Sequence, residues 1–112
     1  MSDREDKRPA ESLPGKRSAE VNVQMEDYRG RIDRLDEEIV RLLNARAAFA
    51  LEVGRLKDSI GIGTYQPERE LDVHEHVQRI NDGPLDMGAI KRLFERIIDE
   101  NRRMERLAKC DY

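Results

Sequence analysis

Apolar residues recur at alternating steps of four and three along residues 25–60, a stretch with no proline and two glycines. This spacing is typical of one long helix with a single apolar seam. Arg46 occupies a seam position, and Lys57 points within roughly 20° of it, because eleven residues at about 100° each exceed three turns by only about 20°. Two cations are therefore predicted to face whatever packs on the seam, and they call for an anion. The seam comprises Tyr28, Ile32, Leu35, Ile39, Leu42, Arg46, Phe49, Val53, Leu56 and Ile60.

A seam of more than about 25 residues is longer than so small a chain covers by itself, so a partner helix is expected. Arg29 precedes Arg46 by seventeen residues, roughly 25 Å along the axis, and cannot share a small ligand with it in one chain. If the partner is the same helix running antiparallel across a two-fold axis, Arg29 of one copy approaches Arg46 and Lys57 of the other. The expected assembly is a homodimer with paired sites at its interface.

Two further helices are predicted after the long one. The glycine-bearing segment IGIGT ends the long helix near Ser59. Pro67 suits the first turn of a short second helix, and the NDGP segment at residues 81–84 ends it. Asp86 is a candidate N-cap for a helix of medium length from about Met87 to Ala108. The predicted fold class is all-α, with three helices per chain.

Composition is that of one small domain that associates. Hydrophobic residues make up 38% and charged residues 40% of the 112, which is typical of solvated helices with a core that oligomerisation completes. The net charge of −3 argues against nucleic-acid binding. A single cysteine, Cys110, fits a reduced cytoplasmic setting, and no apolar run is long enough for a membrane span. We expect residues 1–24, rich in charge, to be a disordered or loosely attached tail before a helical domain at residues 25–112.

Asn101 and Glu105 stand where the stripe of the third helix calls for apolar residues. Buried polar groups are costly unless they are paired. In one interpretation Arg46 and Lys57 extend along the seam to water, or Arg46 pairs with Glu105. In the other, all four bind a small dianion, since guanidinium and ammonium groups suit two carboxylates.

Several chemistries are disfavoured by what the sequence lacks. It holds no Ser-His-Asp set, no placed cysteine nucleophile, no glycine-rich phosphate loop and no metal-ligand cluster. Arg69 and Glu70, beside the proline that begins the second helix, are ordinary surface residues when taken alone. What remains is binding, or a unimolecular reaction accelerated by positioning and electrostatics without a cofactor.

Three segments, IDRLDEEIVRLLNARAAFALEVGRLK, YQPERE and IKRLFERIIDENRRMER, resemble in order and spacing the all-helical class of chorismate mutases. The resemblance covers about residues 25–107. It implies an intertwined homodimer with two sites and an arginine contributed across the interface. It also implies the rearrangement of chorismate to prephenate, without a cofactor, on the way to phenylalanine and tyrosine.

The resemblance assigns roles to matching residues. Arg29 matches the arginine donated by the other subunit, and Arg46 the carboxylate-binding arginine of the long helix. Lys57 matches the lysine that contacts the enolpyruvyl carboxylate and the ether oxygen. Arg69 and Glu70 match the pair that opens the second helix, in which the glutamate accepts from the ring hydroxyl.

Three more positions carry weaker or altered matches. Asn101 stands where the family often has a small polar residue near the ring carboxylate, and Glu105 stands where it has Gln or Glu facing the ether oxygen. Glu105 donates to that oxygen only when it is protonated, so burial would have to raise its pKa. Gln66 replaces an aspartate common in the family, which weakens or relaxes recognition of the hydroxyl side of the ring.

Other interpretations fit the same sequence. The same fold would serve an isochorismate-pyruvate lyase or a mutase acting on an amino analogue of chorismate, although no lysine lies between Asp58 and Gln66 to close over the ligand. A weakly active module that works with a partner enzyme of the shikimate pathway is another. The last is a plain antiparallel helical dimer with no ligand.

Overall fold

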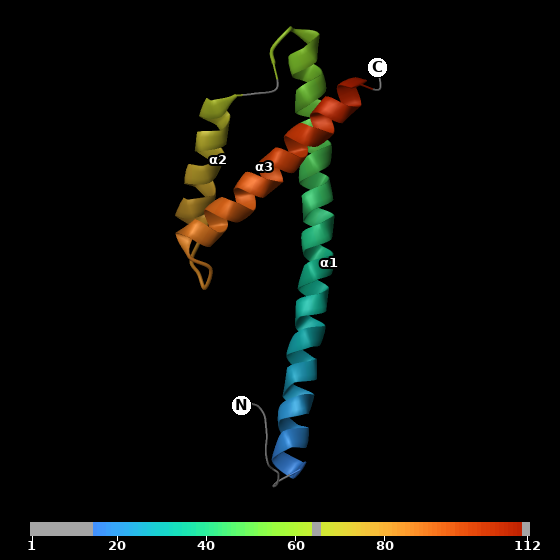
Figure 1. Cartoon of the computed structure of the whole chain (residues 1–112), viewed down its shortest axis with the longest axis vertical. Helices are drawn as coiled ribbons and strands as arrows, with labels where there is room; N and C mark the ends of the chain where they lie inside the picture. The colour runs from blue at the N-terminus through green and yellow to red at the C-terminus, as the bar shows by residue number, and fades with distance from the viewer. Residues whose placement is uncertain (1–14, 64–65, 111–112) are drawn as a thin grey trace, which may run out of the picture. The chain divides into compact units, whose positions relative to one another are not determined.

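The computed structural model describes residues 15–63 and 66–110. Within them the chain forms three helices and no strand, namely α1 at Gly15–Ser59, α2 at Pro67–Ile80 and α3 at Met87–Cys110 (Figure 1). The prediction of an all-α chain with one long, one short and one medium helix is confirmed. The chain divides into two units, Met1–Arg41 and Leu42–Tyr112, and the boundary between them falls within α1.

The first unit contains the N-terminal part of α1. The predicted start near Met25 is wrong, because the helix begins at Gly15. Residues 16–24 contain no proline or glycine, and their Lys, Arg, Ala, Glu and Gln side chains favour the helical conformation. Residues 15–24 of the expected tail are thus helical, and residues 1–14 lie outside the described residues. The division into a tail and a domain at residue 25 stays a prediction.

The end of α1 agrees with the prediction near Ser59. The Ile62 N–H donates to the Lys57 carbonyl at 2.9 Å, and the Gly61 N–H donates to the Asp58 carbonyl at 3.2 Å. These two bonds are those of a Schellman motif, whose central residue takes a left-handed conformation. Gly61 has a φ of 78°, which a residue without Cβ adopts at no steric cost.

Local signals also set the limits of α2 and α3. Pro67 lies in the first turn of α2, where the N–H groups of Arg69 and Glu70 donate to the Gln66 carbonyl. The helix ends at Ile80, before the predicted NDGP segment. The Ala89 N–H donates to Asp86 Oδ1 at 2.7 Å, so Asp86 is the N-cap of α3 as predicted.

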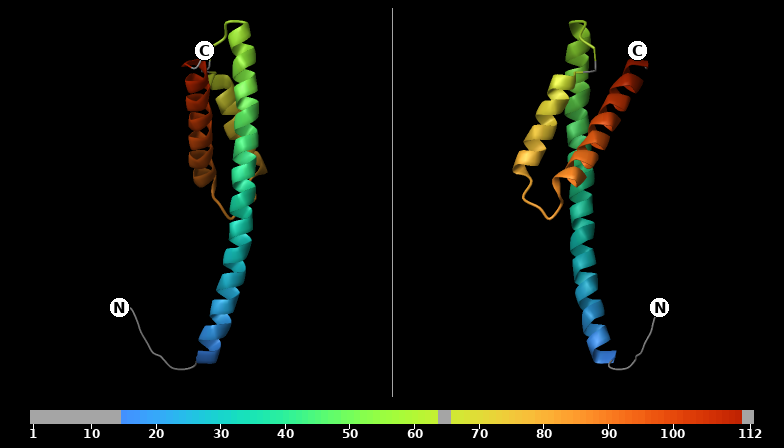
Figure 2. Two further views of the ribbon diagram at one scale, coloured as in Figure 1. Left: turned by 90° about the vertical axis from the view of Figure 1, so that its right-hand side faces the viewer. Right: turned by 60° about the vertical axis from the view of Figure 1, so that its left-hand side comes forward.

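The small core of the second unit lies between α2 and α3. Val73 and Val77 of α2 pack with Ile98 of α3, and the partly buried Ile90 and Phe94 extend the cluster. Figure 2 shows α3 passing beside both α2 and the C-terminal part of α1. In the described ranges, no helix is both long enough and apolar enough to cross a lipid bilayer.

Candidate functional site

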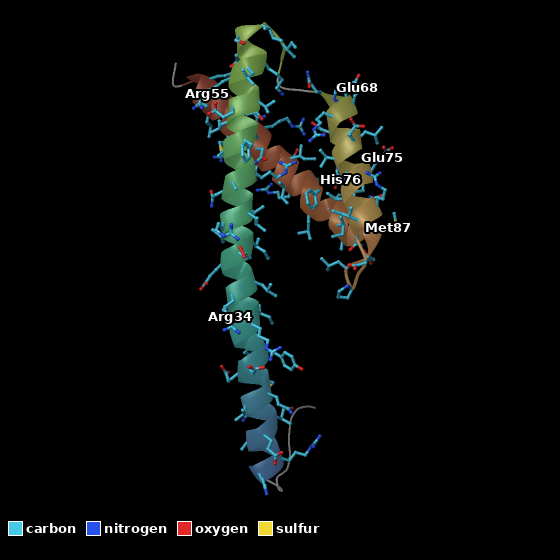
Figure 3. All side chains as sticks on the ribbon, turned by 180° about the vertical axis from the view of Figure 1, so that it is seen from behind. Arg34, Arg55, Glu68, Glu75, His76 and Met87 are labelled. Carbon is cyan, nitrogen blue, oxygen red and sulfur yellow. The ribbon has the colours of Figure 1, made fainter. Side chains whose placement is uncertain are left out.

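A cavity of about 390 Å³ opens in the second unit, between the C-terminal part of α1, the first turns of α2 and the middle of α3. Figure 3 shows the side chains of these helices, with Glu75 on the side of α2 that faces away from α1. The cavity wall therefore belongs to the opposite side of α2. Both charged and apolar side chains line the cavity, namely Arg46, Phe49, Ala50, Val53, Lys57, Gln66, Arg69, Glu70, Val73, Ile98, Asn101, Arg102 and Glu105.

Seven of the eight residues proposed from the sequence line this one cavity. They are Arg46, Lys57, Gln66, Arg69, Glu70, Asn101 and Glu105. Helix α1 carries the first two, the start of α2 the next three, and the stripe of α3 the last two. Residues that interrupt apolar stripes in the sequence thus meet around a common space.

Arg46 is half-buried, and its Nη1 donates to Asn101 Oδ1 at 2.5 Å. Arg46 of α1 and Asn101 of α3, which interrupt apolar stripes, therefore satisfy part of each other's hydrogen-bonding capacity. Burial and then the positive charge of Arg69 lower the pKa of Arg46. Both effects mean that the guanidinium charge is poorly compensated by the protein, which favours the binding of an anion beside it.

Glu105 is the buried charged residue of α3, with 9% of its surface exposed. Its Oε1 has no hydrogen-bond partner among the described residues. Burial raises the pKa of the Glu105 carboxyl and Asp58 adds to the rise, while Lys57, Lys109 and Arg102 act in the opposite direction. Because burial is the largest influence, the neutral carboxylic acid is favoured to a higher pH than in a solvated glutamate.

Gly54 makes room for that carboxyl. It is the buried residue of α1, and a Cβ atom added there would lie 2.9 Å from Glu105 Oε1. A side chain at position 54 would occupy the space where the carboxyl now lies. One turn further, Lys109 Nζ of α3 lies 2.9 Å from Asp58 Oδ1 of α1, which ties the two helices together beside Glu105.

The first turn of α2 supplies the remaining polar wall. Gln66 and Glu70 are half-buried, whereas Arg69 is exposed. Glu70 Oε2 lies 3.2 Å from Arg102 Nη1 of α3. Sequence analysis overlooked Arg102, although it follows Ile98 by four residues and so lies on the same face of α3.

Arg29 is the eighth residue proposed from the sequence, and it belongs to the first unit. Its side chain is exposed and pairs with Glu26 at 3.0 Å, one turn earlier in the same helix. Its contribution across a subunit interface stays a prediction. No group of three or more His, Cys, Asp or Glu side chains with metal-binding geometry occurs among residues 15–63 and 66–110.

A helical cavity that combines several cations with an apolar wall defines a class of small all-α proteins suited to binding a compact anion. The family described as chorismate mutase type II matches residues 28–106, and the chain belongs to this family. The resemblance noted in the sequence is thereby confirmed.

Relatives of known name agree with this assignment. The chain is 42% identical over 79 residues to the bifunctional chorismate mutase/prephenate dehydratase of Neisseria gonorrhoeae, covering 70% of this chain and 21% of that protein. It is 38% identical over 94 residues to the protein of the same name from Pseudomonas aeruginosa, covering 80% and 26%. The chain thus spans about a quarter or less of the length of these relatives.

Solved structures agree as well. The structure of chorismate mutase (form II) from Thermus thermophilus matches with a TM-score of 0.73 and 31% identity, covering 74% of this chain and 94% of that one. Form I of the same enzyme matches with a TM-score of 0.68 and 32% identity, covering 70% and 98%. Fold and family therefore agree.

Proposed function

We propose that this protein is a chorismate mutase, an isomerase that rearranges chorismate to prephenate without a cofactor, in the biosynthesis of phenylalanine and tyrosine. The observation that carries the proposal is the cavity in which Arg46, Lys57, Asn101 and Glu105 meet in a chain of the chorismate mutase type II family. Chorismate is a compact dicarboxylate, and the cationic lining with apolar walls is complementary to it.

The reaction requires positioning rather than a nucleophile. A carbon–oxygen bond of the ether breaks while a carbon–carbon bond forms, so the substrate must be held in a folded conformation. Arg46 and Lys57 bind the two carboxylates and restrict the substrate to that conformation, with Asn101 beside the ring carboxylate. Glu70 accepts a hydrogen bond from the ring hydroxyl, and Arg69 and Gln66 complete that side of the cavity.

The ether oxygen gains negative charge as the bond to carbon breaks. Lys57 and the protonated Glu105 carboxyl donate hydrogen bonds to this oxygen, and fixed donors in a dry site stabilise the transition state more than the ground state. The raised pKa of Glu105 supports this role, because only the neutral acid carries a proton to donate. The catalytic residues proposed are Arg46, Lys57, Glu70 and Glu105.

We infer that the active form is an intertwined homodimer. The seam residues Phe49, Leu56 and Ile60 are 75%, 67% and 71% exposed in the single chain, and so large an apolar surface favours association. A second copy of α1 would cover this seam and bring its Arg29 to the cavity of the first, as expected from the sequence. We also infer a cytoplasmic setting, on the cysteine content of the sequence.

The test is the loss of chorismate absorbance on adding the purified chain, with prephenate identified as the product. Arg46→Ala and Lys57→Ala should each lower kcat/KM at least about 100-fold, since each removes a charged contact to the transition state. Arg79→Ala is a matched control, because Arg79 is exposed on α2 and does not line the cavity. Turnover of isochorismate or of aminodeoxychorismate instead of chorismate would replace the proposal with the lyase or the amino-analogue mutase.

A partner enzyme is a second proposal. The relatives named above combine chorismate mutase with prephenate dehydratase. Prephenate, the product of a chorismate mutase, is the substrate of the second enzyme. We infer that a shikimate-pathway enzyme acts together with this chain. Comparing the activity of the purified chain alone with its activity in the presence of a cognate prephenate-consuming enzyme tests this, and equal rates would argue against it.

A further inference from the structure

Arg102 links α2 to α3 at the wall of the cavity. Its Nη1 lies 3.2 Å from Glu70 Oε2, and its Nη2 donates to Asp99 Oδ1 at 2.8 Å. The Arg102 and Glu70 side chains are 25% and 26% exposed, so water screens their interaction only in part. The guanidinium is therefore held from two sides, by Asp99 on its own helix and by Glu70 across the cavity wall.

The carboxylates of the cavity are few. Among its lining residues only Glu70 and Glu105 carry a carboxyl group, and Gln66 is neutral. Burial raises the pKa of the Glu105 carboxyl, which favours its uncharged form, whereas the Glu70 carboxyl lies against the cation Arg102. An unrestrained Glu70 would have Arg69 as its immediate neighbour and Arg46 in the same cavity as competing cations. The orientation of the Glu70 carboxylate thus depends on which cation it pairs with.

We propose that Arg102 is a positioning residue that holds the Glu70 carboxylate on the cavity wall, where it accepts a hydrogen bond from the hydroxyl group of the bound dianion. This inference rests on the proposed function. Arg102 acts through Glu70 rather than on the reacting atoms, because its two terminal nitrogens already lie against Glu70 and Asp99. A hydroxyl contact present both in the ground state and in the transition state mainly lowers KM.

The experiment is a double-mutant cycle with chorismate as substrate. Arg102→Met keeps an unbranched apolar stem and removes the guanidinium and its charge, and it should raise KM about 10-fold with kcat changed less than about 3-fold. Glu70→Gln should raise KM by more than that. Adding Arg102→Met to Glu70→Gln should then change KM less than about 2-fold, because the residue that Arg102 positions is already altered. Arg102→Lys should recover part of the loss.

Two controls separate positioning from structural support. Arg106→Met makes the same substitution at an exposed position of α3 that lines no cavity described here, and KM should stay at the wild-type value. Denaturant unfolding of the four proteins in the cycle measures whether Arg102 and Glu70 interact in the folded chain, whatever the activity. A coupled shift of the midpoint supports the ion pair, and additive shifts overturn it.

Each outcome decides between the two proposals. Additive effects on KM in an active enzyme overturn the role of Arg102 and leave the mutase function intact. An equal loss on Arg106→Met would show that the effect is not specific to the cavity, and it would also overturn the inference. If wild-type protein does not convert chorismate, the proposed function fails and the substrate-directed role of Arg102 fails with it, while the unfolding cycle still reports the ion pair.

Discussion

Replacing Gly54 by alanine should separate the stability of this protein from its activity. The added Cβ would lie 2.9 Å from Glu105 Oε1 and 3.3 Å from Glu105 Cδ, whereas ordinary contacts begin at 3.4 Å. The carboxyl must therefore move by about 0.5 Å, a distance over which short-range repulsion is steep. Since the atoms in conflict are the end of a flexible side chain, the backbone of α1 can remain in place.

The effects on stability and on rate have opposite directions. Alanine is favoured over glycine within a helix by about 1 kcal/mol, so the free energy of unfolding should stay equal or rise by up to that amount. The rate should fall, because a misplacement of about 1 Å of a group at the reacting centre costs on the order of 100-fold. A shift of half that distance corresponds to a loss of about 10-fold in kcat.

The assay measures kcat and KM on chorismate beside thermal unfolding. Gly30→Ala is the matched control, since a Cβ there meets only Arg34 Nη1 at 3.9 Å, and it should stabilise α1 without loss of rate. Gly54→Ala should cause no further loss of kcat once Glu105→Ala has removed the carboxyl. A stable Gly54→Ala protein with the kcat of wild type would refute the assignment of Glu105 as a donor held in place by Gly54.

Three further results are expected. The rate should fall as pH rises through the raised pKa of Glu105, because the carboxyl then loses the proton that it donates, and Glu105→Gln should flatten the profile. A wild-type rate that does not change between about pH 5 and 8 would contradict this prediction. Ile98→Ala should lower the free energy of unfolding by roughly 2 to 4 kcal/mol in denaturant, since Ile98 is buried in the small core, and a loss below about 1 kcal/mol would show a core that closes over the gap. Mixing the inactive Arg29→Ala and Arg46→Ala proteins should restore up to about a quarter of the activity if subunits exchange, and no recovery in an exchanging mixture would contradict a shared site.

Five of the six helix ends were predicted to within two residues, the end of α3 lying at Cys110 rather than near Ala108, and the sixth has a physical explanation. Gly61, Pro67 and Asp86 each act within a few residues, through a left-handed conformation, a missing N–H and a side-chain cap. Nothing comparable marks position 25. Residues 16–24 favour the helix only through graded propensities, which the high charge content of the segment concealed. The local sequence thus indicates where a helix ends more clearly than it indicates how far a helix extends.

From the sequence, residues of the candidate site could be predicted only where they interrupt the periodic apolar pattern of a helix. Asn101 and Glu105 were found because they interrupt an apolar stripe, which a count along one helix detects. Arg102 was overlooked because a charged residue beside a stripe looks like part of a solvated face. The approach of Glu105 to Gly54 depends on how closely α3 crosses α1, and a distance between two helices has no signature in either of them.

For the proposed rearrangement, the charges of the cavity favour the transition state over the substrate. Four cations line it, namely Arg46, Lys57, Arg69 and Arg102, in a chain whose net charge is −3. Glu70 pairs with Arg102, and burial raises the pKa of Glu105, which favours its uncharged form. In the proposed homodimer Arg29 of the second copy joins Arg46, Lys57 and Arg69, so positive charge exceeds the two carboxylates of the proposed substrate in the ground state. Negative charge that develops on the ether oxygen matches it only as the bond breaks, so the excess lowers the barrier rather than tightening the binding of the substrate.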